Sequence, residues 1–137
     1  MFRRGLPLLL AVLLLPGCGG GGALSKKDVQ KELEAVQSFA AEGALVADGA
    51  ADERTTDIFV RVHTQYLGAG TKKVGEKVSA GQASGDVEDK RQTAVNLASA
   101  VEEQLGRLHR SPGNRDVARD VRDKLQRYAV SAEEAAK

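Results

Sequence analysis

The chain has 137 residues, 28% of them charged, and a formal net charge of +1 at pH 7. A near-neutral charge without a clustered basic face argues against a nucleic-acid or polyanion binder, and the single cysteine excludes an internal disulfide. With three phenylalanines, two tyrosines and no tryptophan, any core must be built from Val, Leu and Ala.

Residues 1–17 have the three parts of an export signal. The pair RR (3–4) gives a positive start, the stretch LPLLLAVLLL (6–15) is apolar, and the pair PG (16–17) ends it before Cys18. The apolar stretch has about half of the ~20 residues that a membrane-spanning helix requires. This length favours a cleaved signal over an anchor helix.

The segment that ends at Cys18 resembles the lipobox of bacterial lipoproteins, in which Leu, a small residue and Gly or Ala precede an invariant Cys. Leu15, Gly17 and Cys18 match this pattern, whereas Pro16 stands where Ala or Ser is usual. The resemblance covers only the start of the chain. It implies that a diacylglycerol is attached to the Cys18 sulfur and that the chain is cleaved between Gly17 and Cys18. The alternative is an ordinary secretory signal with an incidental Cys18.

The resemblance also implies a location, namely the cell membrane or the outer membrane, with the domain facing the periplasm or the exterior. One acyl chain holds a protein only marginally, so the two chains of a diacylglycerol imply a stable anchor. In lipoproteins of two-membrane cells, Asp after the lipidated Cys retains the protein at the inner membrane. Gly19 occupies that position here, which implies delivery to the outer membrane in such a cell.

The remainder of the chain predicts a tether and one domain. Residues 18–24 (CGGGGAL) have the composition of a flexible linker, and residues 25–137 have the length of a single domain. Ala, Glu, Lys and Arg are common there, which favours helix. No stretch of alternating apolar and polar residues is long enough to predict a strand. The predicted fold class is all-α.

The first helix is predicted over residues 25–47. Ser25 can cap it, with Asp28 as its capping-box partner, and DGAAD (48–52) is expected to end it. Its apolar stripe has spacings of three and four and consists of Val29, Leu33, Val36, Ala40 and Gly43, with Phe39 and Val46 beside them.

The second helix is predicted to begin near Glu53 or Thr55. Its expected buried face consists of Phe59, Val62, Tyr66, Gly70, Val74 and Val78, with Ile58 adjacent. Glycines at 68, 70 and 75 weaken this helix by about 1 kcal/mol each relative to Ala. Either their small size lets another helix approach closely, or LGAG (67–70) breaks the helix. We favour one long helix.

AGQASGD (80–86) predicts a turn, after which Asp86 is expected to cap a third helix, with Glu88 and Asp89 complementing the helix dipole. Pro112 ends that helix, and a fourth begins at about Asn114. The third stripe consists of Ala94, Leu97, Val101, Leu105 and Leu108; the fourth consists of Val117, Val121, Leu125, Tyr128, Ala132 and Ala135.

Four amphipathic helices joined by short turns predict an antiparallel up-down four-helix bundle. The second and third helices look longest. The alternative is therefore an elongated hairpin of these two helices that projects past a smaller bundle.

The sequence carries no signature of catalysis. His63 and His109 lie on different predicted helices, with no Glu-x-x-His pair, and Met1 is the only methionine, which excludes Met/His haem ligation in the mature chain. No G-x-S-x-G elbow is present. GAG (68–70) lacks the preceding strand that a phosphate loop requires. We expect no enzymatic activity, no cofactor and no metal.

The leading hypothesis is a membrane-anchored, non-enzymatic protein-interaction or structural module with an envelope protein as partner and no nucleic acid. Its candidate partner groove, after the helix-in-groove mode of recognition, consists of Tyr66, Gly68, Gly75 and Ser79. The architecture is compatible with small helical pilotins and with immunity-type lipoproteins, as a fold-level analogy without a matched motif. The alternative is a small-molecule or lipid carrier that uses the bundle interior.

Overall fold

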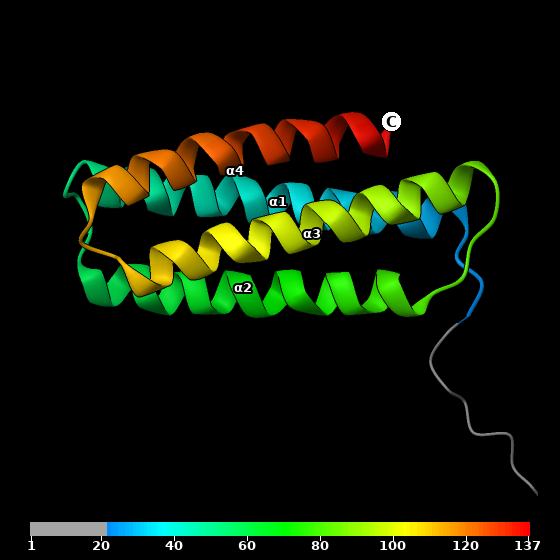
Figure 1. Cartoon of the computed structure of the whole chain (residues 1–137), viewed down its shortest axis with the longest axis horizontal. Coiled ribbons are helices and arrows are strands. Elements are labelled where there is room, and N and C mark those ends of the chain that lie inside the picture. Colours follow the sequence, from blue (N-terminus) through cyan, green and yellow to red (C-terminus); the bar gives the residue numbers. More distant parts are fainter. Residues whose placement is uncertain (1–21) are drawn as a thin grey trace, which may run out of the picture.

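The computed structural model describes residues 22–137 and contains four helices. In chain order they are α1 (Lys26–Ala51), α2 (Asp57–Ala80), α3 (Asp86–Arg110) and α4 (Arg115–Ala136). Consecutive helices run in opposite directions (Figure 1), which confirms the predicted up-down bundle. Their lengths of 26, 24, 25 and 22 residues are similar. The α2–α3 hairpin is therefore part of the bundle, with no elongated extension.

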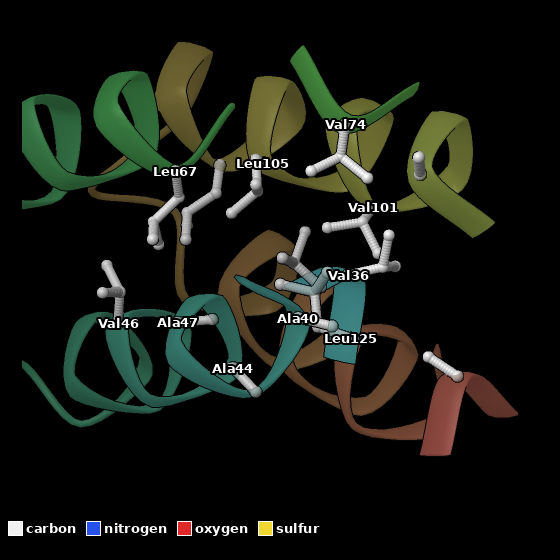
Figure 2. Close-up of a cluster of buried hydrophobic side chains, with 14 of the residues drawn as sticks. Val36, Ala40, Ala44, Val46, Ala47, Leu67, Val74, Val101, Leu105 and Leu125 are labelled. Atoms are coloured by element: carbon white, nitrogen blue, oxygen red, sulfur yellow. The ribbon is translucent and has the colours of Figure 1, made fainter. Parts of the chain in front are cut away.

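The bundle consists of two closely packed helix pairs. α1 packs most extensively against α4, and α2 packs most extensively against α3. α1 also packs against α2 and α3, whereas within residues 22–137 no Cα atom of α2 lies within 8 Å of one in α4. Figure 2 shows Leu67 of α2 and Leu105 of α3 pointing toward α1, the helix that carries Val46 and Ala47. The fully buried hydrophobic residues of the described chain are Val, Leu and Ala, as the composition predicted.

The helix starts are fixed by local hydrogen bonds. The Ser25 hydroxyl accepts from the Asp28 amide, and the Asp28 carboxylate accepts from the Ser25 amide at 2.8 Å, which confirms the capping box. At α4, the Asn114 side chain accepts from the amides of residues 116 and 117. The prediction for α3 was wrong. Gly85 occupies the cap position without a side-chain bond, and Asp86 is the first helical residue.

The end of α1 was also predicted wrongly, because the helix continues through DGAA to Ala51. Gly49 lets the Thr55 methyl approach: a Cβ on this glycine would lie 2.8 Å from Thr55 Cγ2. Asp48 accepts from Arg54 at 2.7 Å and from Arg122 of α4 at 3.2 Å. These contacts with later parts of the chain explain the extra helical turn.

α2 is one unbroken helix, as favoured, but its buried face differs from the predicted one. Phe59, Val62 and Tyr66 were expected in the core and are 41%, 59% and 69% exposed. The buried face has spacings of three and four and consists of Val60, Thr64, Leu67, Thr71, Val74 and Val78. Only the last two of these belong to the predicted face.

Two buried threonines explain this difference. The Thr64 hydroxyl donates to the Val60 carbonyl at 2.7 Å, and the Thr71 hydroxyl donates to the Leu67 carbonyl at 2.8 Å. Each hydroxyl is satisfied within its own helix. Both threonines can therefore occupy core positions, although threonine is a polar residue and was not counted as part of the predicted buried face.

The start of the described chain is attached to the turn between α2 and α3. The Leu24 amide donates to the Gln82 carbonyl at 2.7 Å, and the Gln82 amide donates to the Gly22 carbonyl at 3.2 Å. The Leu24 side chain also covers Gly81. Residues 22–24, predicted as the end of the tether, thus pair with the bundle. The signal sequence, the cleavage residue Gly17 and the lipidation residue Cys18 lie outside the described residues.

None of the helices within residues 22–137 combines the length and the apolar composition that crossing a bilayer demands.

Candidate functional site

The structure brings three of the four predicted groove residues together. Gly68, Gly75 and Ser79 line two hollows between α2 and α3, of about 600 and 270 Å³, which share Lys72, Ser99 and Glu102. We name this surface the α2–α3 groove. Tyr66 lines neither hollow. It belongs to another face of α2, because residues two positions apart on a helix point in different directions.

One small residue of the α2–α3 groove, Gly75, makes a contact inside the molecule. A Cβ on Gly75 would lie 3.4 Å from the Ala98 Cβ of α3, so the helix that approaches this glycine closely is α3 itself. The groove is open, and charged side chains line its wider part, among them Lys72, Glu102 and Arg110. The wider part of the groove is therefore lined by charged side chains as well as by small residues.

Reciprocal bonds join α2 and α3 at the end of this groove. Arg61 Nη1 donates to the His109 carbonyl at 3.2 Å, and His109 Nδ1 lies 3.1 Å from the Arg61 carbonyl. Because a carbonyl only accepts, this contact is a hydrogen bond in the tautomer that carries its proton on Nδ1. Thr64 Oγ1 lies 3.3 Å from the same nitrogen. The His109 Nδ1 thus takes part in the polar contact between α2 and α3.

His63 has a different environment, beside Phe59. The two rings stack with their centroids 4.0 Å apart. His63 Nδ1 is buried without a hydrogen-bond partner in the described part of the chain. Residues 22–137 contain no group of three or more His, Cys, Asp or Glu side chains that could hold a metal ion.

Exposed apolar side chains gather on α1 and α2. Six large hydrophobic residues within the described range are exposed, and only Val130 of these lies on α4. We name the others the α1–α2 patch, which consists of Leu45, Ile58, Phe59, Val62 and Tyr66.

The geometry makes this patch continuous. Ile58, Val62 and Tyr66 are four residues apart along α2 and therefore share one face of the helix. Phe59 of α2, the neighbour of Ile58 in the chain, and Leu45 of α1 line one open hollow of about 320 Å³. The patch thus extends from α2 onto α1.

Two of the four aromatic residues in the described chain, Phe59 and Tyr66, belong to this patch. Neither is fully buried, and the core is completed by smaller residues. The other two, Phe39 and Tyr128, are partly buried and pack against the core.

Sequence reasoning missed the α1–α2 patch because it assigned Phe59, Val62 and Tyr66 to the buried face of the second helix and gave Leu45 no role. A second pattern on α2, from Val60 to Val78 in steps of three and four, was present in the sequence. Counting threonine as compatible with burial would have revealed it. The row of Ile58, Val62 and Tyr66 would then have been recognised as a second apolar face of the same helix.

The rim of the α1–α2 patch carries charges of both signs. Glu42 and Arg54 line the same hollow as Leu45 and Phe59. Arg54 also pairs with Asp52 at 3.3 Å. The patch is therefore apolar in its centre and mixed in charge at its edge.

Comparison with protein-family models, with curated proteins and with solved structures finds no match for this chain.

Proposed function

We propose that this protein is a non-enzymatic protein-interaction module of the bacterial cell envelope, anchored to the cell membrane or the outer membrane by lipid on Cys18. Its docking surface is the α1–α2 patch. The lipobox resemblance supports the anchor. The patch supports the interaction, and it is the observation that carries the proposal.

An exposed cluster of this kind needs an explanation. Single exposed hydrophobic residues are ordinary, but contiguous apolar patches with a polar rim mark interaction sites. Tyrosine is enriched among the residues that dominate binding energy. Tyr66 is exposed in the α1–α2 patch while the core is complete without it, so folding alone does not explain its position.

The positions of the anchor and the patch suggest a protein partner. Gly22 follows Cys18 by four positions, a span of at most about 14 Å, and Gly22 pairs with the α2–α3 turn. Val62 precedes Ala80, the last residue of α2, by a rise of about 27 Å. The proposed anchor would hold the end of the bundle where α2 meets α3. The patch lies on the first half of α2, and Figure 1 shows that α2 begins at the opposite end of the bundle.

A matched pair of substitutions in the full-length chain tests the proposal. Val62 and Val130 are exposed to similar degrees, 59% and 55%, on different helices. Chemical cross-linking in intact cells should capture a complex of higher mass with the unchanged chain. Val62→Glu should abolish that complex, whereas Val130→Glu should leave it intact, with equal melting temperatures for both variants. An unchanged cross-linking pattern with Val62→Glu contradicts the proposal.

A further inference from the structure

We infer that the bundle stands on the membrane with its α2–α3 turn (residues 81–85) facing the lipid headgroups, held in place by residues 22–24. The inference rests on the anchor of the proposed function and names the surface that meets the bilayer. We call residues 22–24 the strap. The chain from Cys18 leads into the strap, which is bonded to the α2–α3 turn before α1 begins at Lys26.

One residue of the α2–α3 turn holds the backbone of the strap. The Gln82 amide donates to the Gly22 carbonyl at 3.2 Å, and the Gln82 carbonyl accepts from the Leu24 amide at 2.7 Å. Ala23, between them, pairs with Gln82 as in a parallel sheet. Both backbone groups of Gln82 are therefore used, and the strap lies in a defined register on the turn.

The Leu24 side chain fixes the strap a second time. It is partly buried against the core and covers Gly81, where an added Cβ would collide with it. Leu24 and Val29 also occupy the two positions of a hydrophobic staple, which fixes the angle at which a chain enters a helix. The Ser25–Asp28 capping box follows directly. The strap is therefore a fixed part of the bundle and not a free linker.

The part of the tether that precedes the strap is short. Gly22 lies at most about 14 Å from Cys18, and detaching the strap as far as Ser25 would extend this reach to about 25 Å. The rise of α3 from Asp86 to Arg110 is about 36 Å. With the strap bonded, the end of the bundle at the α2–α3 turn is held near the headgroups, and the far end of α3 is not.

The composition of the α2–α3 turn suits contact with headgroups. Residues 81–85 (GQASG) carry no charge, and Gln82 and Ser84 are exposed. The long sides of the bundle carry exposed charges of both signs, among them Lys73 and Glu103. Charged side chains lose more hydration than uncharged ones when they are pressed against another surface. The turn beside the strap is therefore better suited than the sides to lie against a bilayer.

Quenching of a fluorophore by labelled lipid tests this orientation in the full-length, lipidated protein. Ser84→Cys and the matched control Arg110→Cys place one label near each end of α3, at positions that are both exposed. Lipid on Cys18 leaves the introduced cysteine as the only free thiol. Each labelled protein is bound to vesicles of phosphatidylethanolamine and phosphatidylglycerol that carry a quencher on the headgroup. The label at position 84 should be quenched several-fold more strongly than the label at position 110.

A second set of variants tests the strap itself. Gly81→Val displaces Leu24, while the backbone at this residue (φ −75°, ψ 156°) remains allowed for valine. Leu24→Ser removes the same contact without adding bulk, and Ala23→Val is the control at an exposed strap position. Exchange of the Gln82 amide hydrogen should become several-fold faster with Gly81→Val and Leu24→Ser and stay unchanged with Ala23→Val. The first two variants should also reduce the difference in quenching between the two labels.

The outcomes separate this inference from the proposed function. Equal quenching of the two labels, or stronger quenching at position 110, on a protein that carries lipid and binds the vesicles overturns the inference while the anchor stands. Unchanged amide exchange in both Gly81→Val and Leu24→Ser overturns the role of the strap. A full-length protein with no lipid on Cys18 and no binding to vesicles contradicts the anchor, and the inference fails with it.

Discussion

Two glycines with equal room for a side chain differ in backbone conformation. A Cβ on Gly68 or on Gly85 would meet no heavy atom within 4 Å. Gly68 lies within α2, whereas Gly85 precedes α3 with φ 57° and ψ −135°. Non-glycine residues rarely adopt that conformation, so the two positions separate helix propensity from backbone strain.

We expect Gly68→Ala to raise the free energy of unfolding by about 0.5–1 kcal/mol, because alanine loses less backbone freedom in a helix. Gly85→Ala should lower it by about 1–3 kcal/mol, because the backbone there becomes strained. Urea denaturation of both variants measures these changes. Changes of the same sign would contradict the assigned backbone conformations.

At the scale of one element, α2 has two apolar faces with different roles. Leu67 is fully buried, whereas its neighbour Tyr66 is 69% exposed. We expect Leu67→Ala to cost about 2–5 kcal/mol of unfolding free energy, since it leaves a cavity in the core. Tyr66→Ala should stay within about 0.5 kcal/mol of the unchanged protein. Chemical denaturation of the two variants measures both changes. A larger loss of unfolding free energy for Tyr66→Ala than for Leu67→Ala would indicate that the face expected from the sequence is the buried one.

The helices could be predicted from the sequence wherever large apolar residues occupy one face. This condition holds for α1, in which Leu33 and Val36 are buried as expected, and for Val121 and Leu125 in α4. The condition fails for α2, because two threonines are buried in the core while larger apolar side chains are exposed to solvent. The end of α1 was not predictable locally, since Asp48 pairs with Arg122, which is distant in sequence.

The candidate site could be predicted only in part, for a related reason. The spacing of Gly68, Gly75 and Ser79 was sufficient to place them along one groove. Assigning Tyr66 to that groove required knowledge of how α2 is rotated in the bundle. Rotation depends on packing against α1 and α3, which one sequence does not contain.

For the whole molecule, paired carboxylates predict sensitivity to acid. The pKa of Asp120 lies below its usual 3.8 because Arg107 and then Lys124 donate hydrogen bonds to its carboxylate. Hydrogen bonds from Ser25 lower the pKa of Asp28, and Arg91 lowers the pKa of Glu88 below 4.5. These contributions to stability are present above the usual pKa values and are lost as pH falls through the lowered ones.

We therefore expect a melting temperature that is insensitive to these groups at neutral pH and decreases as pH falls below about 4. Asp120→Asn should weaken this decrease, because asparagine does not titrate, and should lower stability slightly at pH 7. Thermal melting from pH 7 to pH 2 is the measurement. The same acid dependence in the variant and the unchanged protein would exclude a contribution from Asp120.

At the same scale, the account depends on attachment to a bilayer through one sulfur. The most direct measurement compares the full-length chain with its Cys18→Ser variant in fractionated bacterial cells, together with the intact mass of each product. The account predicts that the unchanged chain sediments with membranes as a product that begins at Cys18 and carries a diacylglycerol. It predicts that the variant lacks this added mass and is lost from the mature membrane-bound pool. Equal sedimentation with equal processing and no lipid mass on either chain would contradict it.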